Sequence, residues 1–210
     1  MSARPVLDVT HLPSEALDHH APLWWGNLLM IVIETTMFAC LVASYFYIAM
    51  YTSPFPPPRA SGPLPSLHDT TPDLPVGTVN MLLLLASCVP MYFADRAARR
   101  MEAIPVVVWL AVAVLAGVAA VALRAFEFPA MHFRWDSNAY GSVVWYFLGF
   151  HLLHLLSATV ETLLLALWVW AKGLDEKHAK DATINAVYWY WMAGVWVPIY
   201  LILYFAPRLI

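Results

Sequence analysis

Three ionisable side chains, His151, His154 and Glu161, occur within one long apolar segment of the sequence. At about 100° per residue along a helix, His154 and Glu161 lie on one stripe and His151 lies close beside it. Ionisable groups inside a membrane are costly unless they face protein or water. Neutral imidazole also binds haem and transition metals, so this polar stripe allows either metal binding or internal hydrogen bonding.

Metal binding by the two histidines would need further ligands. A bis-histidine haem requires a histidine on a facing helix, and the other apolar segments contain none. A di-iron bundle requires Glu-x-x-His motifs on two helices, and for zinc only Glu161 has a suitable spacing. The sequence therefore predicts no metal site, no cofactor and no catalytic residue in this chain. It predicts instead that His151 and His154 hydrogen-bond the fourth helix to its neighbours.

Two more carboxyls, Glu34 and Glu127, join Glu161 as the predicted buried functional carboxyls. Glu34 lies roughly 15 Å along a helix from Trp24, which is too deep for a short side chain to reach the headgroups. We therefore expect Glu34 to face protein. Glu127 follows the third apolar segment between two phenylalanines, and two roles remain open for it: an interfacial carboxylate or a contact with the end of another helix.

The composition is that of an integral membrane protein. Of the 210 residues, 61% are hydrophobic and 12% are charged, with a formal net charge of −3. Soluble domains are nearer half apolar and a quarter charged. No basic patch of the kind that binds nucleic acid is present. The predicted fold class is therefore all-α, with helices that cross the membrane.

Five apolar segments are long enough to span a bilayer, and together they predict one five-helix transmembrane domain at residues 24–206 after a polar tail at 1–23. The connection after the first segment is too rich in proline for a regular element. The predicted spans are about 24–51, 76–94, 104–123, 142–171 and 183–206.

The distribution of Lys and Arg predicts the orientation. With the N-terminus inside, the inner side carries seven of the 11 Lys and Arg residues and the outer side carries the other four. Positive charge favours the inner side, so the expected topology is N-terminus inside and C-terminus outside.

Short motifs on these segments resemble those of one known family, subunit III of the haem-copper terminal oxidases (cytochrome c oxidase subunit 3), in its five-helix bacterial form. The resemblance covers residues 24–206. Its motifs are Ile33–Phe38 (IETTMF), the prolines of Phe55–Pro58, the turn Phe126–Phe128, and Ala139–Ser142 followed by Gly149–His154 (GFHLLH).

The sequence departs from the family pattern in its last helix. The family motif there is Trp-His-Phe-x-Asp-x-x-Trp, and this chain has Tyr190 at the histidine and Ala193 at the aspartate. Leu152 replaces a glycine of the fourth helix, and Glu161 is an additional acid. We infer a divergent branch in which a polar link to the last helix is lost or rebuilt around Glu161.

The resemblance implies an accessory subunit of a respiratory oxidase that reduces oxygen to water and translocates protons in a bacterial inner membrane. Haem and copper would lie in partner subunits. This chain would pack against catalytic subunit I and other subunits, hold phospholipid and support proton uptake. The electron donor stays open. Alternatives are a quinol oxidase or nitric-oxide-reductase-associated subunit, a small proton-coupled transporter using the three carboxyls, and a membrane haem protein.

Overall fold

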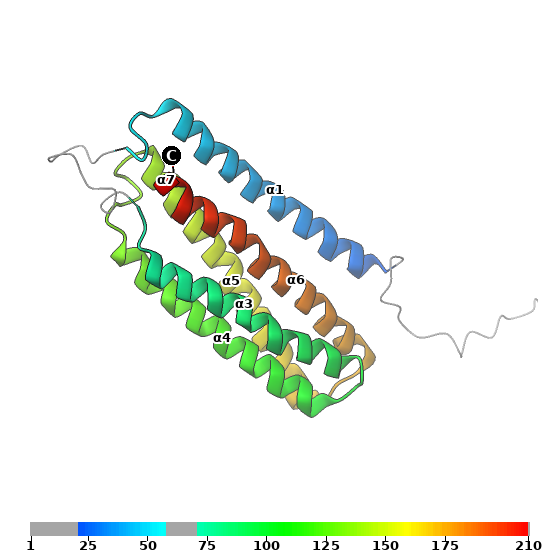
Figure 1. The fold of residues 1–210 in the computed structure, drawn as a ribbon. Coiled ribbons are helices and arrows are strands. Elements are labelled where there is room, and N and C mark those ends of the chain that lie inside the picture. Colours follow the sequence, from blue (N-terminus) through cyan, green and yellow to red (C-terminus); the bar gives the residue numbers. More distant parts are fainter. Residues whose placement is uncertain (1–20, 58–70, 210) are drawn as a thin grey trace, which may run out of the picture.

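The chain folds into long helices that run side by side (Figure 1). The computed structural model describes residues 21–57 and 71–209, and this part contains no strand. Five of its helices are long and apolar enough to cross a membrane, which confirms the predicted five-helix, all-α class. They are α1 (Pro22–Tyr51), α3 (Leu74–Ala98), α4 (Ala103–Ala130), α5 (Ala139–Lys172) and α6 (Glu176–Tyr200), the last extended by η1 (Leu201–Phe205) and α7 (Ala206–Leu209).

Two predicted features fall wholly or partly outside the described residues: the polar N-terminal tail up to residue 20 and the middle of the proline-rich connection at 58–70. The direction in which the chain crosses the membrane stays a prediction.

Capping residues set where the two longest spans, α5 and the extended α6, begin. The Asn138 side chain accepts a hydrogen bond from the Gly141 amide at 2.7 Å where α5 begins, and Asp175 accepts one from the His178 amide at 2.8 Å where α6 begins. The first backbone amides of a helix lack intrahelical partners, so such caps fix its start. Gly173, at φ 83°, ends α5 with a backbone conformation that favours glycine.

Helices α3, α4, α5 and α6 form a closely packed four-helix bundle. Small residues allow this close approach. At Gly117 of α4, an added Cβ atom would overlap Thr159 of α5 and lie 3.0 Å from Trp189 of α6. The bundle therefore has no room for a larger side chain at this crossing.

Helix α1 lies on one flank of the bundle and packs chiefly against α5 and α6 (Figure 1). Only Asn27, Phe38 and Tyr45 of its 30 residues are buried. Phe38 is the main apolar contact, with its ring centroid 5.2 Å from that of Phe150 and 6.1 Å from that of Trp191. Helix α1 is thus attached along a narrow line.

The π-helical turn η1 brings the end of the chain against the start of α3. A Cβ atom added at Gly77 would lie 2.5 Å from the Tyr204 ring. Beyond the turn, Arg208 donates a hydrogen bond to the Pro72 carbonyl at 2.8 Å. The turn therefore directs the last residues onto the end of the bundle.

Candidate functional site

Glu34 of α1 faces α5 and α6, with 18% of its side chain exposed. The Tyr188 hydroxyl of α6 donates a hydrogen bond to Glu34 Oε2 at 3.0 Å. The Nε2 atom of His154, on α5, lies 3.6 Å from the same oxygen. The carboxyl is therefore held at the meeting point of three helices, facing protein on one side as its depth predicts.

The second ring nitrogen of His154 fixes how this contact works. Nδ1 lies 2.7 Å from the Phe150 carbonyl, which can only accept a hydrogen bond, so Nδ1 carries a proton. A neutral His154 then presents a lone pair at Nε2 toward Glu34. Contact between this lone pair and a carboxylate is favourable only when one additional proton sits on either group. Glu34 and His154 thus form a pair suited to holding one proton.

Ser157 extends this arrangement along α5. Its hydroxyl donates to the His154 carbonyl at 3.0 Å. We call Glu34, His154, Ser157 and Tyr188 the polar seam. One further bond, from the Trp191 indole to Thr35 Oγ1 at 2.8 Å, joins α6 to α1 beside it. Directional polar contacts therefore carry much of the attachment of α1.

A second polar region lies inside the bundle. Arg124 and Glu127 of α4 are buried, with 0% and 4% of their side chains exposed, and an Nη1–Oε2 distance of 2.8 Å joins them. The guanidinium lies 4.0 Å above the ring of Trp196 on α6. Asn80 of α3 is buried beside Glu127. Two opposite charges this far from water stabilise each other strongly, and either alone would be costly.

Several buried polar atoms around this ion pair have no hydrogen-bond partner among the described residues. They include Nε and Nη2 of Arg124, Oε1 of Glu127, Nδ1 of His151 and Nε1 of Trp196. His151 contributes its other nitrogen, which lies 3.1 Å from the Met192 carbonyl, and its ring centroid lies 4.3 Å from that of the tilted Trp196 ring. Groups from α4, α5 and α6 thus make one polar centre in an apolar bundle.

The residues of the predicted polar stripe on the fourth helix face different neighbours in the structure. His151 faces the bundle interior, whereas His154 faces α1. The prediction that Glu161 is buried is wrong for this chain, because its side chain is exposed on α5. The reason is geometric: Glu161 lines a cleft of about 310 Å³ between α5, α6 and the first turn of α1, where its side chain stays exposed. Glu127 is buried and pairs with Arg124 of its own helix.

The links from α6 to its neighbours involve residues that the sequence reasoning did not select. Besides the Tyr188 bond, the Trp189 indole donates to Ser87 at 2.9 Å, and Asn185 donates to Thr162 at 3.0 Å. The polar link was expected to be lost or rebuilt around Glu161, and the bond from Tyr188 to Glu34 is one of several polar links that α6 makes. The sequence signal that could have identified these residues is the recurrence of polar side chains inside apolar helices. Such side chains typically form hydrogen bonds to neighbouring helices.

Metal binding has no support from side-chain positions. In residues 21–57 and 71–209, no three His, Cys, Asp or Glu side chains gather closely enough to hold a metal ion.

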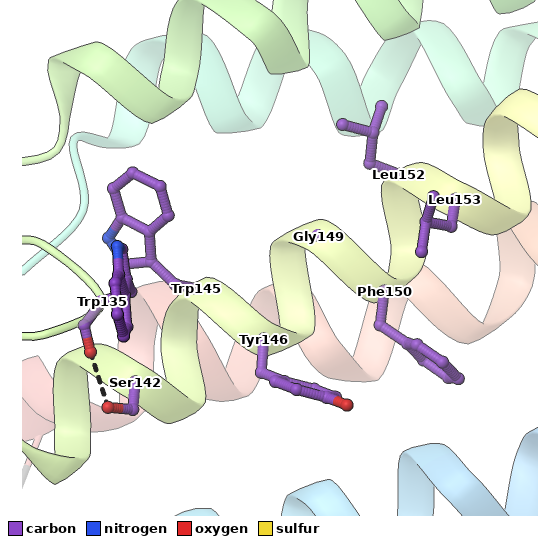
Figure 2. A pocket seen from close by; sticks show the side chains of 8 residues that line it. All are labelled: Trp135, Ser142, Trp145, Tyr146, Gly149, Phe150, Leu152 and Leu153. Atoms are coloured by element: carbon purple, nitrogen blue, oxygen red, sulfur yellow. Dashed lines mark hydrogen bonds between the residues drawn. The ribbon is translucent and has the colours of Figure 1, made fainter.

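An apolar groove of about 610 Å³ follows the outer face of α5. Figure 2 shows Trp135 at one end, where its carbonyl accepts a hydrogen bond from Ser142 at 2.6 Å, and Tyr146 and Phe150 projecting on the same side of the helix. Aromatic and aliphatic side chains are the usual lining of sites for apolar ligands. The complete lining is Trp135, Ser142, Trp145, Tyr146, Gly149, Phe150, Leu152 and Leu153.

Comparison with known proteins gives consistent matches over almost the whole chain. The family model described as cytochrome c oxidase subunit III matches residues 9–207. A cytochrome c oxidase subunit 3 from Lumbricus terrestris is 27% identical over 193 residues, covering 90% of this chain and 73% of the relative. The subunit 3 of the cyanobacterium Synechocystis is 24% identical, covering 94% of this chain and 83% of the relative. That of Danio rerio is 29% identical, with 89% and 72% covered.

Proposed function

We infer that this chain, which belongs to the cytochrome c oxidase subunit III family, supports proton uptake and durability in an oxidase whose chemistry takes place elsewhere in the complex. Family membership makes it a subunit of a haem-copper respiratory oxidase and implies that it carries no redox centre itself. The match favours this reading over the transporter and the membrane haem protein considered from the sequence.

The observation that carries the proposal is the position of Glu34. A carboxyl inside the membrane, bonded to Tyr188 and paired with His154, can accept and release a proton. Intramembrane ionisable groups that face protein commonly belong to proton pathways. The seam contains groups that carry protons and no set that could carry electrons, which suits an accessory role.

The outer surfaces suit contact with lipid and with another subunit. We propose that the groove along α5 holds a phospholipid acyl chain, since aromatic and aliphatic side chains line it. The loosely packed α1 would contact the catalytic subunit I, because most of its large apolar residues are exposed. We further propose a bacterial inner membrane, consistent with the cyanobacterial relative.

Removal of the chain tests this function. Membranes with and without it, matched for haem content, are compared for oxygen consumption over many turnovers. We expect a lower proton-dependent rate and a faster loss of activity, with the haem spectrum largely preserved. Restoring the chain should restore both. Unchanged rate and unchanged decay would refute the proposal, and complete loss of haem would show an assembly role instead.

The proposed topology has its own test. In a variant without Cys40 and Cys88, single cysteines replace Asp136, between α4 and α5, or Lys177, at the start of α6; both native residues are exposed. With the N-terminus inside, an impermeant thiol reagent applied from outside should label the first position only. The reverse pattern would invert the orientation.

A further inference from the structure

We propose that the four-helix bundle binds a small cluster of ordered water molecules in its interior, between Asn80, Arg124, His151 and Trp196. This internal site lies inside the bundle rather than at the polar seam. The inference is therefore independent of the role proposed for Glu34.

Contacts at two tryptophans of α6 show that the bundle is built in layers. Trp189 donates to Ser87 of α3 at 2.9 Å, and a Cβ atom added at Gly117 of α4 would lie 3.0 Å from the Trp189 ring. Seven residues later on α6, the centroid of Trp196 lies 4.0 Å from the guanidinium carbon of Arg124, which is seven residues beyond Gly117. Seven residues make two helical turns, about 10 Å, so these contacts belong to two successive layers.

The other two helices also contribute to the second layer. The start of α3 is bonded to the end of α6, so these two helices are antiparallel. Asn80, seven residues before Ser87 on α3, is therefore level with Trp196. On α5, the ring centroid of His151 lies 4.3 Å from that of Trp196. Each helix thus places one fully buried side chain in what we call the Trp196 layer: Asn80, Arg124, His151 and Trp196.

The two layers differ in how their polar atoms are paired. At Trp189, the indole is bonded to Ser87, and the hydroxyls of Ser87 and Thr159 donate to carbonyls of their own helices. In the Trp196 layer and at the adjoining Glu127, seven buried polar atoms lack a partner within the part of the chain that the structure describes. Buried polar groups in proteins are nearly always hydrogen-bonded, to protein or to water. The unpaired atoms are Nδ2 and Oδ1 of Asn80, Nε and Nη2 of Arg124, Oε1 of Glu127, Nδ1 of His151 and Nε1 of Trp196.

The hydrogen-bonding direction of these atoms identifies the ligand. The unpaired nitrogens of Arg124 and Trp196 donate, whereas Oε1 of Glu127 accepts. Nε2 of His151 donates to the Met192 carbonyl, so Nδ1 of the neutral ring accepts. A charged ring would add a second cation beside Arg124, which is costly inside a bundle. The ligand must therefore both donate and accept hydrogen bonds.

Charge narrows the choice to water. Arg124 and Glu127 already neutralise each other across 2.8 Å, so the site favours a neutral ligand. An anion would leave the acceptors unpaired, and a metal cation would be repelled by Arg124. Buried water molecules make about three hydrogen bonds each, so about two or three of them would satisfy the seven unpaired atoms. Water in this position would join α3, α4, α5 and α6 through bonds that no direct side-chain contact supplies.

The experiment is an electron cryo-microscopy map of the whole oxidase complex, at a resolution where ordered water is visible. We expect water density within hydrogen-bonding distance of Arg124, His151 and Trp196, and none between Trp189 and Gly117. Well-resolved side chains with no water density in the Trp196 layer would overturn the proposal. Side chains that have turned to bond directly to one another would overturn it as well.

Two variants of the complex sharpen the assignment. Arg124→Met combined with Glu127→Leu removes three of the unpaired atoms and both charges, and we expect the water density to be lost. Thr162→Val is the matched control, because it removes a buried interhelical bond, to Asn185, outside this layer. The control should keep the water density. Density that persists in the double variant would contradict a site held by the ion pair.

Hydrogen bonding of the Trp196 indole gives a second readout, in solution. Ultraviolet resonance Raman spectra are recorded for the wild-type complex and for Trp196→Phe, and their difference isolates the Trp196 bands. The same subtraction with Trp189→Phe gives the reference for an indole bonded to Ser87. We expect both indoles to show a hydrogen-bonded N–H, and a free N–H at Trp196 would overturn the proposal. If a variant fails to assemble, the wild-type map decides alone.

Discussion

The two sides of the α5–α6 pair are built differently. On one side α4 buries eight of its 28 residues and meets α5 and α6 at small residues such as Gly117. On the other side α1 buries three of its 30 residues and is tied by the polar seam and the Phe38 ring. Lipid provides no hydrophobic driving force between helices, so association depends on close packing or on polar bonds. The bundle combines close packing with polar bonds such as Trp189 to Ser87, whereas α1 packs sparsely and depends chiefly on polar bonds.

This difference makes the α3–α6 bundle a rigid scaffold and the attachment of α1 an adaptable surface. Close packing at small residues fixes one arrangement of α3, α4, α5 and α6. The contacts of α1 are fewer and directional, which keeps titratable groups accessible at the seam. Substitutions in the two regions should therefore have different consequences, and the following predictions test this in order of decreasing effect.

The largest effect should follow from breaking the buried ion pair. Glu127→Leu leaves the Arg124 guanidinium charged and uncompensated inside the bundle, and we expect a loss of about 3–5 kcal/mol of stability. Arg124→Met combined with Glu127→Leu should recover most of that loss. Unfolding in mild detergent measures both. Equal destabilisation of the single and the double variant would contradict a coupled pair.

Close packing predicts a smaller loss. Gly117→Ala introduces a Cβ atom that overlaps Thr159 and meets Trp189, and overpacking of this kind typically costs about 1–3 kcal/mol. Gly194→Ala is the matched control, since nothing lies within 4 Å of a Cβ atom there. Thermal unfolding of the two variants side by side gives the comparison, and equal melting temperatures would argue against tight packing at Gly117.

The seam should respond to a single hydroxyl without affecting the bundle. Tyr188→Phe removes the bond to Glu34, and interhelical hydrogen bonds in membranes contribute about 0.6 kcal/mol on average. We expect spin labels on α1 and α6 to report a broader distance distribution, whereas labels on α3 and α4 should be unaffected. Broadening in both pairs would mean that the two regions are not independent.

The smallest effect concerns the connection that positions α6 for both regions. The His178 amide that bonds to Asp175 lowers the pKa of this carboxyl. Because the folded pKa lies below the unfolded one, the stabilisation is present above the unfolded pKa and is lost as pH falls through the folded pKa. Asp175→Asn should therefore flatten the acid limb of the stability curve and slightly lower stability at neutral pH, where the wild-type stabilisation is present. An unaltered acid limb would exclude a role for this cap.

Much of the fold could be predicted, because an apolar segment long enough to span a bilayer indicates a transmembrane helix by itself. The ends of the helices could not be predicted in this way. Predicted spans stopped where charges began, at 123 and 183, yet α4 continues to Ala130 and α6 starts at Glu176. Mean hydropathy counts Arg124 and Glu127 as two separate charges that disfavour a membrane span. In α4 these two charges neutralise each other.

The candidate site was predicted less completely than the fold. The depth of Glu34 indicated that it faces protein, and this needs only its position along one helix. Its partner could not be found in that way, because the contact between Glu34 and Tyr188 joins residues 154 positions apart. Glu161 was predicted to be buried because an acid inside the membrane is costly unless it faces protein or water. Whether another helix covers it depends on packing rather than on periodicity.

The π-turn η1 affects how this sequence should be aligned. A π-turn holds one residue more than an α-turn. Deleting one residue between 201 and 205 would let the α-helix continue and leave the residues after it on the same faces, whereas an extra residue in a helix without the π-turn would rotate them by about 100°. The π-turn thereby keeps Arg208 on the Pro72 carbonyl despite the added residue. A relative whose last helix is regular should therefore align with a one-residue gap here, and residue correspondences beyond this point shift by one.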